Sequence, residues 1–421
     1  MKKILSIVLS LVMVLGMVAF TGCGSSGGDG ESTGGDVKIG VILVGDENEG
    51  YTYAHIEGIK EAAEACNISE DQIIWKYTIG EDETCADAAA DLADQGCTAI
   101  FSNSYGHQSY MQSAAEQYPD VTFVACTGDT AAASGLPNFK NAFTKVYESR
   151  YVAGVVAGMK IAELDANGEI PKKSIDKDGN VKIGYVGAYP YAEVVSGYTA
   201  FFLGIKSVYE DVAMEVTYTN SWFDITKEGE AANSLMSDGC LIIGQHADST
   251  GAPAAVQAAY DKGETVFSVG YNIDMLSVAP QAALTSATNI WGTYYTMAFN
   301  CLLNGEDIPV DYAAGYNENG VAITDLGESC AEGTQEKVDE IIAGIKDGSI
   351  KVFDVTTFTA PEGDFYKVDA DGHLTSCFAL DTDGDFIPDS EEAVVDGAFV
   401  ESELRSAPYF QIRIDGITEL N

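Results

Sequence analysis

Short apolar runs alternate with longer amphipathic segments from residue 37 to about residue 355. The first run, 37–44, is apolar almost throughout, which is typical of a strand that is covered on both faces of its sheet. The next segment, 51–66, places apolar residues at helical spacing on one face. Further strand-like runs lie at 73–77, 99–102, 122–125, 181–186, 213–218, 241–244, 265–269 and 283–285.

This alternation predicts an α/β fold in which parallel sheets carry helices on both faces. About nine strands are more than a typical sheet of four to six contains, so we expect two sheets. The stretch 147–180 ends in a polar, glycine-containing insertion and is the natural place for the break.

The N-terminus has the pattern of an export signal. Lys2 and Lys3 precede an apolar run over 4–20, and a Gly- and Ser-rich stretch follows Cys23. The run resembles a bacterial lipobox, which predicts a signal peptide over 1–22 and a lipidated Cys23 at the start of a tether over 23–36. The alternative is an uncleaved membrane anchor, because about 17 apolar residues is the lower limit for spanning a bilayer.

Composition narrows the possible partners. The net charge of −43 argues against binding to nucleic acid, and 46% hydrophobic residues suffice for folded cores. Cys23 is one of nine cysteines. The other eight are even in number in an oxidising compartment, so disulfides are possible, but no paired spacing occurs and we expect buried free thiols and no zinc site.

Candidate site residues follow the predicted strands, since ligands of such sheets bind beyond the carboxyl ends of the strands. The segments after the strands combine aromatic rings with hydrogen-bonding groups, which favours a cleft between two lobes that stacks a flat ligand. The candidates are Asp46, Tyr51, Tyr53, Ser104, Tyr105, Tyr189, Glu193, Trp222, Phe223, His246, Asp248, Tyr271, Asn272 and Asp274.

Several of these segments, taken in order, resemble one family. They are Gly50-Tyr51-Thr52-Tyr53-Ala54-His55, the stretch 146–154, Thr219-Asn220-Ser221-Trp222-Phe223-Asp224, Gln245-His246-Ala247-Asp248-Ser249 and Gly270-Tyr271-Asn272-Ile273-Asp274-Met275. In this combination the chain is similar to the basic membrane protein family of ABC transporter substrate-binding lipoproteins, which includes purine nucleoside receptors. The resemblance spans about 37–355.

The resemblance implies a type I periplasmic-binding fold with a ligand cleft between two lobes. It implies a first lobe of 37–146 and 284–310, a second lobe of 147–283 and 311–355, and an acidic C-terminal extension over 356–421.

The resemblance also implies roles for individual residues. A purine would lie between two rings, one from Tyr51 or Tyr53 and one from Trp222 or Phe223. Asp46 would meet the edge of the base, and Asn272 or Asp274 would bind the ribose.

One departure from the family pattern concerns the ribose. The nucleoside receptors carry a lysine in the segment that here reads Ala287-Thr288-Asn289-Ile290-Trp291. The loss of that cation, with the large ring of Trp291 nearby, favours a free base or another flat heterocycle over a nucleoside. Trp291 is therefore a further candidate for ligand contact.

The C-terminal extension contains a separate motif. Asp381, Asp383, Asp385, Asp389 and Glu392 stand at positions 1, 3, 5, 9 and 12 of a calcium-loop pattern. Position 6 is Phe386 where such loops usually have glycine, which argues against an EF-hand helix pair. A structural Ca²⁺ site and a plain acidic turn both remain open.

The combined prediction is a monomeric extracytoplasmic lipoprotein, not an enzyme, that binds a purine base or nucleoside and delivers it to an ABC permease. Two alternatives remain. The protein could sense the same ligand for a membrane receptor. Alternatively, His246 and Asp248 could serve a metal-dependent extracellular hydrolase, although no nucleophile motif accompanies them.

Overall fold

The strands form where the hydrophobic pattern predicts them. In the computed structural model, which describes residues 37–382 and 387–421, each of the predicted runs overlaps a strand. The signal segment and Cys23 lie outside these residues. Among the described residues before 290, the one strand that was not predicted is β5 (Phe139–Thr144), because Lys140 and Asn141 interrupt its apolar run although both are buried. The strands after residue 310 were not predicted either.

The first sheet belongs to one lobe and is parallel throughout. Its strands, in spatial order, are β11 (Asp311–Ala314), β5, β4 (Thr122–Cys126), β3 (Ala99–Ser102), β1 (Ile39–Ile42) and β2 (Ile73–Lys76). Successive side chains of a strand point to opposite faces. Ile39 and Val41 accordingly pack with α1 (Gly50–Cys66) and α9 (Trp291–Asn304), and Ile42 packs with α2 (Glu83–Asp94) and α3 (Gln108–Gln117).

The second sheet forms the other lobe. Its strands, in spatial order, are β12 (Val321–Ile323), β10 (Ala283–Asn289), β9 (Phe267–Tyr271), β8 (Ile242–Gln245), β6 (Val181–Gly187), β7 (Val212–Tyr218) and β18 (Ile417–Glu419). Only the pairing of β12 with β10 is antiparallel among these described strands. One face packs on α5 (Val146–Asn167) and α6 (Ala192–Lys206), and the other packs on α7 (Ile225–Ser237) and α8 (Gly251–Tyr260).

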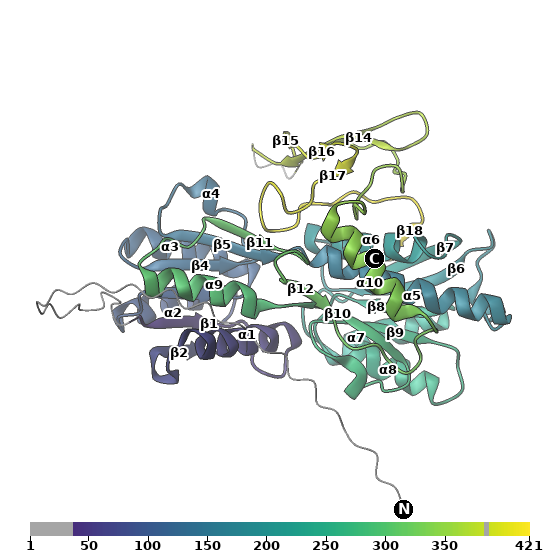
Figure 1. Cartoon of the computed structure of the whole chain (residues 1–421), viewed down its shortest axis with the longest axis horizontal. Coiled ribbons are helices and arrows are strands. Elements are labelled where there is room, and N and C mark those ends of the chain that lie inside the picture. Colours follow the sequence, from purple (N-terminus) through teal and green to yellow (C-terminus); the bar gives the residue numbers. More distant parts are fainter. Residues whose placement is uncertain (1–36, 383–386) are drawn as a thin grey trace, which may run out of the picture. The chain divides into compact units, whose positions relative to one another are not determined.

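The two lobes confirm the predicted α/β architecture but correct the predicted boundaries. Strand β10 pairs with β9 in the second sheet, so residues 284–289 do not belong to the first lobe as expected. The chain crosses at Ile290 and then forms α9, which lies with the first-lobe elements in Figure 1. Strand β11 pairs with β5 in the first sheet, so residues 311–314 do not belong to the second lobe.

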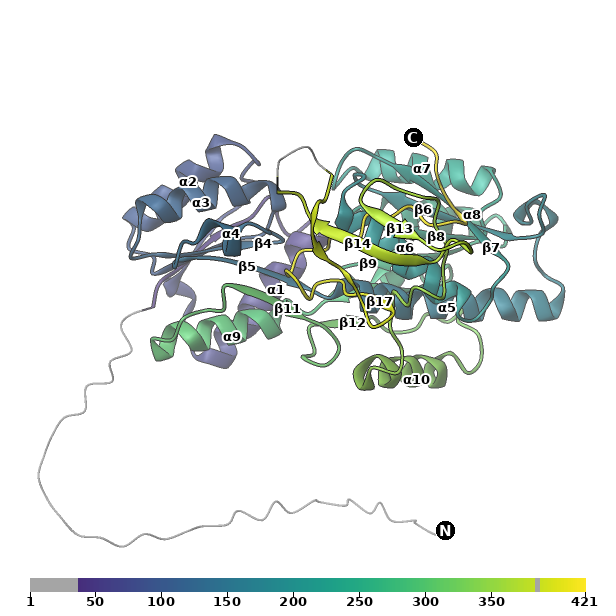
Figure 2. The same cartoon turned by 90° about the horizontal axis from the view of Figure 1, so that it is seen from above.

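The C-terminal extension is built into the second lobe. Helix α10 (Thr334–Asp347) precedes it, and its own short strands are β13 (Tyr366–Val368), β14 (Leu374–Leu380), β15 (Ser390–Glu392), β16 (Val394–Val395) and β17 (Ala398–Phe399). The final strand, β18, extends the second sheet by parallel pairing with β7. Phe399, Tyr409 and Phe410 join the same hydrophobic cluster as α5 and α6. Figure 2 shows this yellow segment lying over that lobe.

All eight cysteines in the described part are unpaired, as expected. No helix among the described residues is both long and apolar enough to cross a membrane.

Candidate functional site

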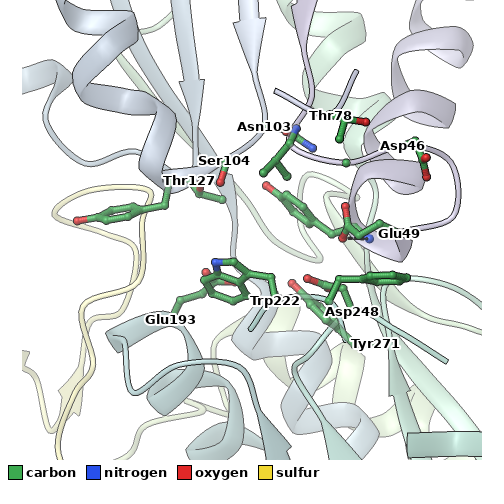
Figure 3. Close-up of a pocket in the computed structure, with 15 residues that line it drawn as sticks. Asp46, Glu49, Thr78, Asn103, Ser104, Thr127, Glu193, Trp222, Asp248 and Tyr271 are labelled. Atoms are coloured by element: carbon green, nitrogen blue, oxygen red, sulfur yellow. Dashed lines mark hydrogen bonds between the residues drawn. The ribbon is translucent and has the colours of Figure 1, made fainter. Parts of the chain in front are cut away.

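A cavity of 310 Å³ lies between the carboxyl ends of the two sets of parallel strands, where the sequence analysis expected the ligand. Figure 3 shows side chains of the two lobes facing one another across it. First-lobe residues lining it are Val44, Gly45, Asp46, Glu49, Tyr51, Thr78, Asn103, Ser104, Tyr105 and Thr127. Second-lobe residues lining it are Glu193, Trp222, Phe223, Asp248 and Tyr271.

Tyr51 of the first lobe lies in the first turn of α1, and the capping residue Glu49 fixes this turn. The carboxylate of Glu49 caps α1, because its oxygens accept hydrogen bonds from the backbone N–H groups of Tyr51 (3.0 Å) and Thr52 (2.9 Å). The ring of Tyr51 packs edge-on against His55, with centroids 4.6 Å apart. His55 in turn stacks on the buried Trp291, with centroids 3.9 Å apart. This packing holds the Tyr51 ring at the cavity wall.

Two threonines at the ends of first-lobe strands have an unusual backbone. Thr78 follows β2 with φ of 58°, and Thr127 follows β4 with φ of 65°. A β-branched residue with positive φ is rare, because its side chain crowds the backbone in the left-handed region. Such conformations cluster at functional sites, and both threonines line the cavity.

The second lobe contributes carboxyl groups as well as rings. Asp248 follows β8 and is 5% exposed, and its Oδ1 accepts a hydrogen bond from the side-chain amide of Asn272 (2.8 Å). Burial raises the pKa of Asp248 well above its ordinary value, and the negative charge of Glu49 across the cleft raises it further. Burial also raises the pKa of Glu49. These groups therefore retain protons at higher pH than exposed carboxyls.

A buried arginine supports the second-lobe side of the cavity. The guanidinium of Arg150 lies 3.7 Å from the centroid of the Tyr271 ring, and its Nη1 donates to the carbonyl oxygen of Gln245 (2.5 Å). His246 Nε2 lies 3.1 Å from Glu193 Oε1. Burial, with the nearby charge of Arg150, lowers the pKa of His246 to about 4, so this imidazole is neutral at pH 7.

Most of the candidates predicted from the sequence reach the cavity. Those that line it are Asp46, Tyr51, Ser104, Tyr105, Glu193, Trp222, Phe223, Asp248 and Tyr271. Those that do not are Tyr53, Tyr189, His246, Asn272, Asp274 and Trp291.

Three of these six candidates are either exposed, paired with a neighbouring ring or placed at the cap of a turn. Tyr53 is 40% exposed and does not line the cavity, unlike Tyr51 two residues earlier on α1. Tyr189 stacks on Tyr191, with ring centroids 5.1 Å apart. Asp274 accepts a hydrogen bond from the backbone N–H of Leu276 and so caps a short 3₁₀ turn.

The other three lie behind the wall rather than in it. Trp291 is 1% exposed and supports Tyr51 through His55. His246 is buried and partners Glu193. Asn272 orients Asp248. Each of the three therefore acts on the cavity through a residue that lines it.

Six lining residues were not predicted from the sequence: Val44, Gly45, Glu49, Thr78, Asn103 and Thr127. Asn103 directly follows β3, and its Oδ1 accepts a hydrogen bond from the backbone N–H of Val44 (2.9 Å). Position after a strand was therefore an available signal for Thr78, Asn103 and Thr127. For Glu49, the signal was an acidic residue directly before a helix.

The structure describes only part of the calcium-loop pattern. Asp383 and Asp385 lie outside the described residues. Glu392 Oε1 accepts hydrogen bonds from the backbone N–H groups of Cys377 (2.8 Å) and Val394 (2.9 Å), and Asp389 accepts one from the hydroxyl of Thr382. Within 37–382 and 387–421, no group of three or more His, Cys, Asp or Glu side chains is placed to hold a metal ion.

Comparison with known proteins identifies the family. Residues 36–354 match the family described as "ABC transporter substrate-binding protein PnrA-like". The chain belongs to this family. Its members are extracytoplasmic solute-binding proteins that work with a permease and are not enzymes, so the hydrolase alternative is excluded.

Two relatives cover most of this chain. The purine-binding protein of Brucella abortus is 32% identical over 318 residues, which are 75% of this chain and 83% of the relative. A Haloferax volcanii protein named for glucose binding by an ABC transporter is 31% identical over 318 residues, which are 75% of this chain and 73% of that relative.

Solved structures confirm the fold. A solute-binding protein of an ABC transporter from Aeropyrum pernix superposes with a TM-score of 0.62 at 16% identity, covering 78% of this chain and 94% of that one. Another from Conexibacter woesei superposes with a TM-score of 0.56 at 20% identity, covering 75% of this chain and 98% of that one.

Proposed function

We propose that this protein is a monomeric lipoprotein that binds a purine base or nucleoside outside the cell and delivers it to an ABC permease. The observation that carries the proposal is the cavity between the lobes. It combines aromatic rings from both lobes with four carboxyl groups, and none of its fifteen lining residues is basic.

Ring stacking is the first part of the proposed recognition. Tyr51 and Tyr105 come from the first lobe, and Trp222, Phe223 and Tyr271 come from the second. Stacking of a base on an aromatic side chain contributes about 1–3 kcal/mol per base. A flat ring held between the lobes would therefore favour their closure around it.

The carboxyl groups are the second part. Asp46, Glu49, Glu193 and Asp248 line the cavity, and the oxygens of a carboxyl group can accept hydrogen bonds. The amino and ring N–H groups of a purine supply the matching donors. A phosphate would meet negative charge and no lining cation, so we expect nucleotides to be rejected.

Two relatives support different ligands. The purine-binding name of the Brucella abortus relative, at 32% identity, supports the purine assignment. The glucose-binding name of the Haloferax volcanii relative, at 31% identity, supports a sugar as the second candidate. Rings and carboxylates can bind both ligand classes, so the two candidates must be separated by experiment.

Calorimetry with purified protein separates these candidates. We expect adenine or adenosine to bind, and glucose and 5′-AMP not to bind under the same conditions. Mass spectrometry of any small molecule that copurifies with the protein gives an independent identification. Binding of glucose without binding of any purine would overturn the purine assignment and leave the solute-binding role intact.

The lipid anchor has its own test. The proposal rests on the apolar run before Cys23 and the Gly- and Ser-rich stretch after it. Cys23→Ser should move the protein from the membrane fraction to the detergent-free soluble fraction without changing its ligand affinity. Continued retention of the variant on membranes would contradict the lipid anchor.

The partner also has its own test. Transport requires a permease, whereas the sensing alternative requires a receptor. Uptake of labelled ligand by cells should fall when the neighbouring permease gene is deleted. Unchanged uptake in that strain would favour sensing.

A further inference from the structure

A second, larger cavity adjoins the one described above. Its volume is 730 Å³, and the two cavities share four lining residues, Tyr105, Thr127, Glu193 and Trp222. We call the first cavity the inner pocket and the second the outer compartment. Because they share walls, a ligand held in the inner pocket could extend directly into the outer compartment.

The C-terminal extension forms one wall of the outer compartment. The lining residues on this side include Arg405, Ala407, Pro408, Tyr409 and Gln411. All of them follow residue 354, where the match to the family ends. This wall is therefore an addition made by the C-terminal segment, and the opposite side of the outer compartment is formed by residues within the family match.

This wall is fixed on the second lobe. The carboxylate of Glu401, which is 1% exposed, accepts hydrogen bonds from the backbone N–H groups of Tyr409 (2.9 Å) and Phe410 (2.9 Å). Phe410 also stacks on Phe353, with ring centroids 4.5 Å apart and planes at 11°.

The wall also contacts the first lobe and the crossing segment. The backbone N–H of Ser406 donates to Asp311 Oδ2 (2.9 Å), and Asp311 begins β11 of the first sheet. Lys145, between β5 and α5, forms an ion pair with Glu403 (2.5 Å). These contacts hold the wall against the first lobe and the crossing segment as well as the second lobe.

The side chains of the outer compartment define the chemistry that it could bind. Tyr105, Tyr191 and Trp222 supply flat apolar surfaces, and the carboxyl groups come from Asp129, Glu193 and Asp381. Such a set suits a group that has both an apolar face and hydroxyl or amine donors.

The single arginine in the described lining is already neutralised. Arg405 pairs with Glu391 and donates through Nη1 to the carbonyl oxygen of Ala379 (3.0 Å). An anionic group would therefore meet three carboxyl groups, and the one arginine in the described lining already has a carboxylate partner.

We infer that the outer compartment is a second subsite, which binds a hydroxyl- or amine-bearing group without negative charge that is attached to the ring held in the inner pocket. This inference rests on the proposed function, because the ring must first bind in the inner pocket. It extends that function by predicting that the C-terminal extension helps to select the ligand.

The test fills the outer compartment and leaves the inner pocket unchanged. Gln411 lines only the outer compartment and is partly buried, so Gln411→Trp places a large ring in that space. Val395→Trp adds the same ring at a position of the extension that is 46% exposed and lines neither cavity, and it serves as the matched control.

Calorimetry with adenine and adenosine gives the result as a ratio of dissociation constants, adenosine over adenine. We expect this ratio to rise about tenfold in Gln411→Trp and to stay within about twofold of the wild-type value in Val395→Trp. Tyr191→Ala, at a position that is 50% exposed, should raise the ratio by about threefold, because it removes one apolar surface.

An unchanged ratio in both Gln411→Trp and Tyr191→Ala overturns the second subsite, whatever happens to either affinity alone. If the wild-type protein bound neither adenine nor adenosine, the proposed purine function would instead be overturned, and the inference with it. Because the ratio cancels losses common to both ligands, partial misfolding of a variant cannot imitate the expected result.

Discussion

The two lobes meet the cleft with different chemistry. In the first lobe, Tyr51 packs against a buried aromatic stack that is formed by His55 and Trp291. The second lobe places Asp248 and Glu193 at the cavity, and a buried network that includes Arg150 and His246 lies behind them. Both lobes contribute rings and carboxyl groups to the cavity, so stacking by the rings and recognition of hydrogen-bond donors by the carboxyl groups should be separable by mutation within each lobe.

The largest expected effect comes from removing a ring. Tyr51→Ala should weaken adenine binding about tenfold or more, because a stacked ring contributes about 1–3 kcal/mol. Trp222→Ala should have a similar effect from the opposite lobe. Tyr53→Ala is the matched control, since Tyr53 lies on the same helix but outside the cavity. Calorimetry that shows equal losses for Tyr51→Ala and Tyr53→Ala would contradict the assignment of Tyr51.

A smaller effect is expected from the second lobe. Asp248→Asn should weaken adenine binding by about five- to tenfold, as expected for the loss of a hydrogen bond to an ionisable group. The same substitution should weaken the binding of unsubstituted purine less, because that ring lacks the amino donor. Asp274→Asn is the control, because Asp274 caps a turn outside the cavity. Equal losses of affinity for adenine and for purine would mean that Asp248 does not accept a hydrogen bond from the amino group of adenine.

The pH dependence of stability should also originate mainly in the second lobe. Burial raises the pKa of Glu401 to about 8 and that of Glu228 to about 7. An unfolded glutamate has a pKa of about 4.3, so between these values the folded chain binds more protons than the unfolded chain. This stabilisation is fully present below about pH 4.3 and is lost as the pH rises through the folded-state values, with a limiting slope of about 1.4 kcal/mol per pH unit for each proton.

Thermal denaturation at pH 5, 6, 7 and 8 measures this dependence. From pH 5 to pH 8 the melting temperature of Glu401→Gln should fall less, or rise more, than that of the wild type, because the substitution removes one of the groups whose pKa is raised. The lowered pKa of His246 acts in the opposite direction, but it does so equally in both proteins. Glu403→Gln is the control, since that carboxylate is exposed. The same change of melting temperature in Glu401→Gln and in the wild type would contradict the assignment.

The smallest expected effect concerns calcium. If the pattern over 381–392 binds Ca²⁺, millimolar calcium should raise the melting temperature by about 1–3 °C, because a ligand of the folded state stabilises it. Asp381→Asn combined with Asp383→Asn should abolish this shift. Magnesium and a chelator are the controls. An identical melting temperature with calcium and with chelator would favour a plain acidic turn.

Local pattern predicted nine of the thirteen described strands in the two large sheets, and the sheet edge at which the cavity lies. Parallel strands bring their carboxyl ends to one edge, so the segments after them were good candidates. Lys140 and Asn141 concealed β5 because polar residues rarely signal a buried strand. Asn141 is satisfied there by two other segments, since its Nδ2 donates to the carbonyl oxygen of Ala125 and its Oδ1 accepts from the backbone N–H of Ala131.

The sequence by itself determined the order of strands and helices, the aromatic and acidic content of the strand ends, and the family. Only the tertiary structure decided which of Tyr51 and Tyr53 faces the cavity, that Trp291 supports the wall rather than forming it, and that β18 completes the second sheet. The reason is physical. Periodicity records which face of an element is apolar, whereas the neighbour on that face is set by packing between segments that are distant in the sequence.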